Sequence, residues 1–163
     1  MRNASLLKVC KKFSTNLHCL NMIICVAIFS AIAVFPSLMI EILQWDSTPH
    51  QDQKGILSYL NDVVIVPIIE TLLFQLLPFH IAQHLAWRGS ARISAMIIPF
   101  AIVHESGGYL AIVNAAFGGC ILTLTFHMWV RRSIRCAVCM TLSVHAVANA
   151  AAYICDGLLA RNF

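Results

Sequence analysis

The chain has 163 residues, of which 60% are hydrophobic and only 11% are charged. Soluble globular domains carry about 25% charged residues, so this composition excludes an ordinary soluble domain. The formal net charge of +4 does not require a nucleic-acid partner, because basic loops beside membrane segments account for it. The mean hydropathy of +0.80 also favours a membrane protein.

Apolar segments follow one another along the chain and indicate membrane helices, which need roughly 20 apolar residues to cross the hydrocarbon core. Three are long and free of Asp, Glu, Lys and Arg, one contains a single acid, and one is short. They do not alternate polar with apolar residues as membrane strands do. We therefore predict an all-α fold, a polytopic transmembrane bundle of about five membrane helices. The segments are 22–40, 63–79 (with the acid), 93–103 (short), 109–130 and 136–154.

We treat residues 1–163 as a single membrane domain, and the charged residues between the segments predict which side of the membrane each loop occupies. Nine of the eleven Lys and Arg residues fall on one side of the five-helix arrangement, which the positive-inside rule assigns to the cytoplasm. We predict an integral protein of the bacterial inner membrane with a cytoplasmic basic N-terminus, 1–19, followed by a retained anchor. A polar loop at 44–62 has room for a short interfacial helix, and 63–155 forms the core that carries the motifs. A re-entrant third segment would invert the later helices.

Four polar residues interrupt the apolar segments. Glu70 follows Pro67 by three residues, His104 ends the short third segment, and His145 and Asn149 lie four apart on one helical face. Ionisable side chains within a bilayer cost about 2.5–3.5 kcal/mol each on insertion scales and usually face a bundle interior or a cavity. Considered alone, a buried Glu can also form a structural hydrogen bond or belong to a proton pathway. A His at a helix end can also lie at the membrane interface. Their depths place all four in the outer half of the membrane, where one cavity could gather them.

The other residues of metal-ligating type form no complete site. His80 and His84 lie four apart without a third ligand, and we interpret them as interfacial. The lone C-x-x-C at 136–139 has no second pair, so packing is the favoured interpretation. The His104-Glu105 pair lacks the second His of an H-E-x-x-H motif. We predict no metal and no cofactor.

The order and spacing of the polar residues resemble the CAAX protease and bacteriocin-processing family of intramembrane glutamate endopeptidases. That family carries E-E-x-x-x-R, then F-x-x-x-H, then H-x-x-x followed by an amide or acid, on successive membrane helices. This chain offers Glu-Thr-Leu-Leu-Phe-Gln at 70–75, Phe to His at 100–104 and His to Asn at 145–149. The resemblance covers roughly the second to the fifth segment.

The resemblance implies a role for each of the four residues. Glu70 and His104 activate water, and His145 and Asn149 help to hold the oxyanion. Peptide hydrolysis needs a base for water and donors aimed at the developing negative charge, which agrees with these residue types. The mechanism requires no nucleophilic Ser or Cys and no metal.

Three further residues have supporting places in the resemblance. Phe100 begins the second motif, while Thr71 and Gln75 stand where the family has its second Glu and its Arg. Those two positions are four apart and turned away from Glu70. The family's charges could form an ion pair there, and we expect the neutral pair to be able to hydrogen-bond instead.

The resulting prediction is a membrane-embedded, metal-independent endopeptidase acting on a peptide or protein substrate, which can be membrane-associated. The alternative is a non-proteolytic protein of the same fold, a bacteriocin self-immunity factor or scaffold, which the lost Glu and Arg motivate. A proton-coupled carrier using Glu70 is a third hypothesis. Five helices without a paired inverted repeat argue against it.

Overall fold

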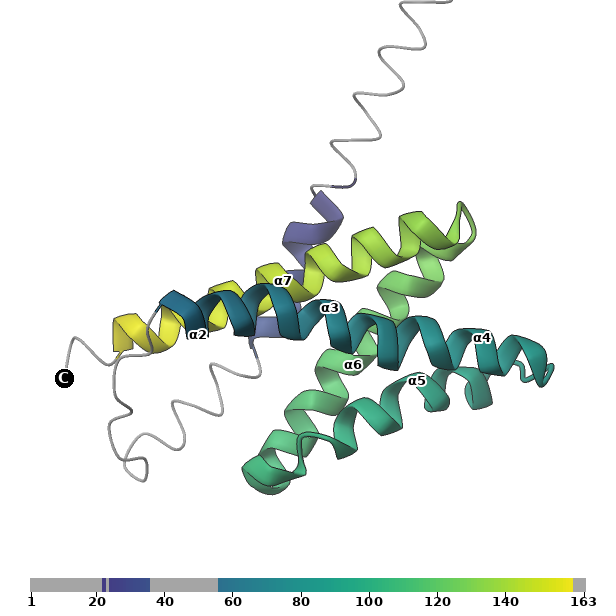
Figure 1. Ribbon diagram of the computed structural model, residues 1–163, viewed down its shortest axis with the longest axis horizontal. Helices are drawn as coiled ribbons and strands as arrows, with labels where there is room; N and C mark the ends of the chain where they lie inside the picture. Colours follow the sequence, from purple (N-terminus) through teal and green to yellow (C-terminus); the bar gives the residue numbers. More distant parts are fainter. Residues whose placement is uncertain (1–21, 23, 36–55, 160–163) are drawn as a thin grey trace, which may run out of the picture.

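The computed structural model describes residue 22 and residues 24–35 and 56–159, with side chains as far as Cys155. Within these ranges the chain forms five helices and no strand, which confirms the all-α prediction (Figure 1). The first helix is Ile24–Phe35, and the second is a continuous 29-residue helix, Ile56–His84. The remaining elements are α5 (Ser90–Ile102), the short 3₁₀ turn η4 (Glu105–Gly107), α6 (Gly108–Val130) and α7 (Ile134–Leu159).

Three of these helices are long and apolar enough to cross a membrane: Ile56–His84, Glu105–Val130 and Ile134–Cys155. Helix α5 has 13 residues and is about 20 Å long, in agreement with the short third segment. The predicted first segment, 22–40, is helical as far as Phe35, while 36–40 lie outside the described residues. The predicted basic segment 1–19 also lies outside them.

The second helix changes its winding along its length. It consists of α2 (Ile56–Leu60), the π-helical turn η2 (Asn61–Ile65), α3 (Val66–Glu70), a second π-helical turn η3 (Thr71–Leu76) and α4 (Leu77–His84). Each π turn directly precedes an α segment with proline in its first two positions, Pro67 in α3 and Pro78 in α4. A proline inside an α-helix clashes with the carbonyl four residues earlier, and a wider i→i+5 turn relieves that crowding.

This helix also begins seven residues before the predicted segment 63–79. Residues Ile56 to Asp62, which we assigned to the polar loop, form its first turns, because the apolar stretch at 56–60 continues the helix and η2 accommodates Asn61 and Asp62. Glu70 therefore lies at the midpoint of the 29-residue helix. It is deeper than the roughly 10 Å from the segment start that the sequence suggested.

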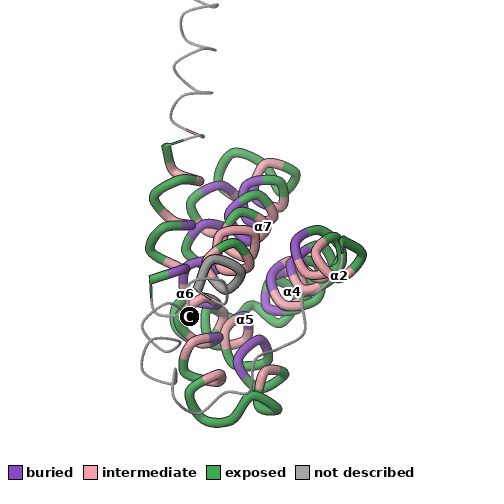
Figure 2. The backbone as a smooth tube through the Cα atoms, turned by 90° about the vertical axis from the view of Figure 1, so that its left-hand side faces the viewer, coloured by how far each residue is buried: buried purple, intermediate pink, exposed green. Residues whose placement is uncertain are grey.

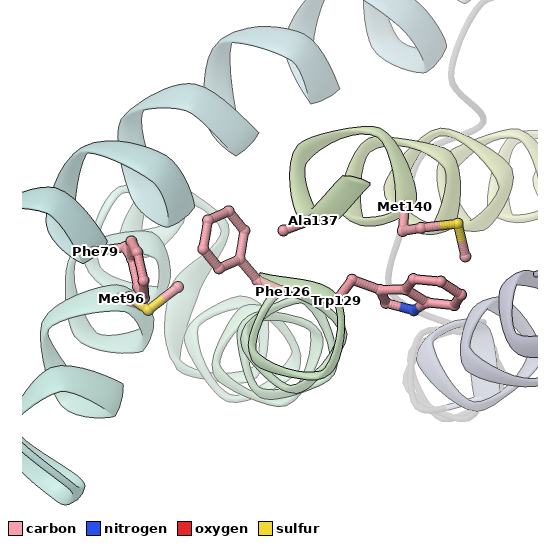
Figure 3. Packing of buried hydrophobic residues seen from close by; sticks show 6 residues of the cluster. All are labelled: Phe79, Met96, Phe126, Trp129, Ala137 and Met140. Carbon is pink, nitrogen blue, oxygen red and sulfur yellow. The ribbon is translucent and has the colours of Figure 1, made fainter. Parts of the chain in front are cut away.

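Helix α6 is central to the packing, in contact with α5, α7 and η3, while α7 packs against η2, α3 and η3. The residues of the long helix alternate between a buried stripe, with Val63, Pro67, Thr71 and Gln75, and exposed apolar positions (Figure 2). Two apolar clusters hold the bundle together. One contains Phe79, Met96, Phe126, Trp129, Ala137 and Met140 (Figure 3), and the other contains Phe100, Ala115, Ile121, Leu122 and Val144.

Charge is separated between the two ends of the bundle. The α4–α5 and α6–α7 turns both lie toward the right in Figure 1, and all arginines in the described ranges occur in or beside them. Arg92 lies over the Phe79 ring at 5.4 Å, and Arg132 lies over the Trp129 ring at 4.6 Å. Asp62 and Glu105 belong to elements at the opposite end. That the turns with the arginines share one side of a membrane stays a prediction.

Candidate active site

Glu70 is the last residue of α3 and stands between the two π turns. Its side chain is only 15% exposed. Each carboxylate oxygen faces the imidazole of a different histidine, one from the end of α5 and one from the middle of α7. Segments 34 and 75 positions away along the chain thus meet at Glu70.

His104 lies in the turn after α5, where its backbone N–H bonds to the Ala101 carbonyl at 3.2 Å. Its ring Nδ1 is 2.8 Å from the Phe100 carbonyl oxygen. A carbonyl only accepts, so Nδ1 carries the hydrogen and donates it. The other nitrogen, Nε2, is 3.7 Å from Glu70 Oε1. The backbone bond therefore fixes the ring with Nε2, an acceptor in the neutral ring, toward the carboxylate, so that a water molecule beside both groups could donate to each of them.

His145 is the buried partner of the same carboxylate. Its Nε2 is 3.2 Å from Glu70 Oε2, and its side chain is 7% exposed, against 37% for that of His104. Its Nδ1 is buried with no hydrogen-bond partner among the described residues. In the neutral ring the hydrogen therefore belongs on Nε2, where the carboxylate accepts it. We had grouped His145 with Asn149 as a supporting pair, but in the structure it lies closer to Glu70 than His104 does.

Asn149, one turn further along α7, bonds to a different part of the long helix. Its Nδ2 donates to the backbone carbonyl of Asp62 at 2.9 Å. Glu70, His104 and His145 are therefore brought together, while the recorded hydrogen bond of Asn149 is made at η2. The amide has two N–H donors, and this bond uses one of them.

Phe100 packs against both imidazoles. Its ring centroid is 4.9 Å from that of His104, 5.9 Å from that of His145 and 5.8 Å from that of Phe74. Gly119 of α6 lies on its other side, where an added Cβ would stand 3.1 Å from the Phe100 ring. Phe100, near the end of α5, thus packs against both histidines that face Glu70.

Thr71 and Gln75 are buried, but they do not form the hydrogen bond that we expected between them. Gln75 Oε1 instead accepts from the Thr123 hydroxyl of α6 at 3.2 Å. Thr71 Oγ1 and Gln75 Nε2 have no partner within the described part of the chain. The i→i+5 winding of η3 is the physical reason, because it displaces residues four apart from the stacking of an α-helix.

Sequence reasoning also missed Thr123. The available signal was a polar residue in an apolar segment without charged residues. This signal is ambiguous, because Thr125 gives it too. The Thr125 hydroxyl donates to the Ile121 carbonyl of its own helix at 2.8 Å rather than to Gln75. The Asp62 carbonyl, a backbone group, left no signal of its own.

The remaining candidates stay outside the site. Cys136 is half-buried and Cys139 is exposed, and both are free thiols. No group of three or more His, Cys, Asp or Glu side chains in the described ranges is arranged to hold a metal ion. His127 donates from Nδ1 to the Thr123 carbonyl at 3.0 Å.

A carboxylate flanked by two imidazoles can take a proton, hold it and return it. The fold and this site together define a membrane-embedded helical protein in which a buried glutamate carboxylate lies between two histidines. The family model described as type II CAAX prenyl endopeptidase Rce1-like matches residues 52–151, and the chain belongs to this family. The family predicted from the motifs is thereby confirmed.

Membership of this family makes the chain an integral membrane protein of the CAAX-protease type, with a peptide or protein as substrate. The matched residues include Glu70, His104, His145 and Asn149. No match was found among curated proteins or among solved structures.

Proposed function

We propose that the protein is a glutamate-type intramembrane endopeptidase that needs no metal. Glu70 takes a proton from a water molecule, with His104 orienting that water, and the water oxygen attacks the peptide carbonyl carbon. The C–N bond then breaks, and Glu70 returns the proton to the leaving amine. The observation that carries the proposal is the position of the Glu70 carboxylate between the Nε2 atoms of two histidines.

His145 has the complementary task in this scheme. Its Nε2–H points at the carboxylate while Glu70 is charged. Once Glu70 has taken a proton, it becomes a weaker acceptor, since hydrogen bonds to ionised groups are roughly twice as strong as neutral ones. The N–H is then available to the oxyanion that forms next to it, and Asn149 supplies a further amide donor.

The separation of arginines from acidic residues supports one orientation of the bundle in the membrane. We place the arginine-rich end of the bundle in the cytoplasm by the positive-inside rule, and a cytoplasmic N-terminus stays a prediction. The substrate then reaches Glu70 from within the bilayer at mid-depth, on the side of the more exposed His104. Residence in a bacterial inner membrane stays a prediction.

The test uses protein purified in proteoliposomes with a prenylated CAAX peptide, the substrate class in the family's name, and products read by mass spectrometry. Glu70→Gln and His104→Ala should each abolish cleavage. Glu105→Gln is the matched control, because it removes an exposed carboxylate next to His104 and should leave the rate unchanged. Wild-type cleavage by both site variants would refute the mechanism.

The non-proteolytic alternative is favoured by one observation, the neutral and incompletely bonded Thr71 and Gln75 where the family has charges. A self-immunity factor of this fold would protect a bacteriocin-producing cell by binding. Protection that persists in Glu70→Gln, together with no cleavage by folded wild-type protein, would establish this alternative.

A further inference from the structure

A cavity of about 300 Å³ lies between the first helix and the end of α6. This volume is at the lower end of the roughly 300–1,000 Å³ that is usual for small-molecule sites. The first helix lies outside the stretch 52–151 that matches the family model, and the lining includes none of the residues around Glu70. The cavity is therefore separate from the candidate active site. Its lining residues are Ile24, Cys25, Met128, Trp129 and Arg132.

The indole of Trp129 brings a buried hydrogen-bond donor to this cavity. Trp129 is 5% exposed, and its Nε1 has no hydrogen-bond partner within the described part of the chain. Figure 3 shows the indole pointing from α6 toward the purple first helix, the element that forms the other wall of the cavity. A buried indole N–H usually has an acceptor, and the indole itself can only donate. A ligand of this cavity should therefore carry an acceptor atom.

The second polar group of the cavity is a guanidinium. Arg132 lies over the Trp129 ring at 4.6 Å, and among the described side chains no carboxylate forms an ion pair with it. Arg131 and Arg135 add positive charge within three positions of it along the chain. A guanidinium binds phosphate and carboxylate groups through paired N–H donors. The acceptor should therefore belong to an anion.

The position of the cavity in the membrane selects among anions. The apolar span Glu105–Val130 ends two residues before Arg132, so the guanidinium lies where a membrane helix meets the lipid headgroups. The remaining lining is apolar. Exposed apolar side chains continue from it along both walls, Ile28 one turn from Ile24 and Leu124 one turn from Met128. An anion that carries acyl chains matches the charged part and the apolar part together.

We propose that this cavity binds one anionic glycerophospholipid. The phosphate accepts hydrogen bonds from the Trp129 Nε1–H and from the Arg132 guanidinium, and an acyl chain lies along Ile28 and Leu124 toward the bilayer interior. The bound lipid joins the first helix to α6. The proposal goes beyond the endopeptidase function and does not depend on it, because no group around Glu70 takes part in the binding.

Native mass spectrometry of the full chain, released from uncharged detergent micelles, measures this binding. The probes are phosphatidylglycerol, the diacylglycerol with the same acyl chains, and inorganic phosphate. We expect one phosphatidylglycerol per chain, with an affinity at least about tenfold above that of diacylglycerol, because only the former offers charged acceptors. Equal binding of the two lipids would overturn the proposal, since acyl chains alone would then be recognised. Binding of inorganic phosphate as tight as that of phosphatidylglycerol would overturn the lipid assignment.

Arg132→Gln should lower the affinity for phosphatidylglycerol by about 10- to 100-fold, the effect of losing a hydrogen bond between charged groups. Arg88→Gln is the matched control, because it removes the same charge from an exposed arginine in the α4–α5 turn that does not line the cavity. It should leave the affinity within about threefold. Equal losses for the two variants would show attraction by net charge alone and would overturn the proposal.

The role of the indole is measured in the wild-type protein, because Trp129 also packs in an apolar cluster. In ¹⁵N-tryptophan-labelled protein, the indole signal that Trp129→Phe removes should shift when phosphatidylglycerol is added and stay in place with diacylglycerol. An indole signal that phosphatidylglycerol leaves unchanged, or that both lipids shift equally, would overturn the proposed phosphate contact.

Discussion

Two adjacent glycines of α6 should respond in opposite ways to the same substitution. A Cβ at Gly119 would lie 3.1 Å from Phe100 Cδ1, whereas one at Gly118 would have no atom within 4 Å outside its own helix turn. Carbon atoms pack best at about 3.5–4.0 Å, so Gly119→Ala requires a shift of roughly 0.5 Å. Phe100 cannot give way easily, because it is 5% exposed and packs against Phe74 and both site histidines.

The magnitudes follow from two opposing effects. Replacing Gly by Ala in a helix gains about 1 kcal/mol, while overpacking a close-packed site costs about 1–3 kcal/mol. Gly118→Ala should therefore raise the free energy of unfolding by about 1 kcal/mol, and Gly119→Ala should lower it by about 0–2 kcal/mol. Because Phe100 holds both imidazoles, a shift of half an ångström should also lower kcat by about tenfold.

The assay pairs thermal unfolding in detergent micelles, followed by circular dichroism, with peptide cleavage in proteoliposomes. Gly118→Ala serves as the internal control for expression, insertion and helix propensity. If Gly119→Ala matches Gly118→Ala in both stability and kcat, the argument that Phe100 is immobile and positions the histidines is wrong.

Further changes probe the buried polar groups, the topology and the chemistry. Thr123→Val should lower stability by about 1–3 kcal/mol, because it leaves the Gln75 carbonyl unpaired; an unchanged melting temperature would contradict this. Gln75→Arg should cost about 3–5 kcal/mol as an unpaired buried charge, and a variant as stable as the wild type would refute this. In a cysteine-free background, Ser106→Cys and Ser133→Cys should react with impermeant thiol reagents from opposite sides of the membrane, and labelling from one side would exclude the proposed topology. Cleavage should persist in a metal chelator; loss that zinc restores would show metal dependence.

The meeting of Glu70, His104 and His145 could be anticipated from the sequence because each is costly in an apolar segment unless it shares a polar partner. The destination of Asn149 could not. Its amide bonds to a backbone carbonyl, that of Asp62, and the residue pattern does not show which backbone carbonyl of another helix lies nearest. The second helix begins at Ile56 rather than near residue 63, and the sequence misplaced this start because Asn61 and Asp62 are typical of loops.

The pairing of Gln75 was likewise not predictable from spacing. Positions 71 and 75 stack in an α-helix, but η3 is not wound as one, and the acceptor was satisfied by Thr123 from another helix. Local rules thus placed the ionisable side chains correctly and failed where the winding of the backbone changes.

The two π turns have a consequence for how the site can be adjusted. A π turn is equivalent to an α-helix with one residue inserted, and one residue corresponds to a rotation of about 100°. The five residues of α3 lie between two such insertions, so the direction in which Glu70 points is set independently of the anchoring of either end of its helix. Deleting one residue from Thr71–Leu76 would rotate α4 relative to α3 by about 100°. The helix therefore consists of three α-helical segments, α2, α3 and α4, whose relative rotation is set by the two π turns between them.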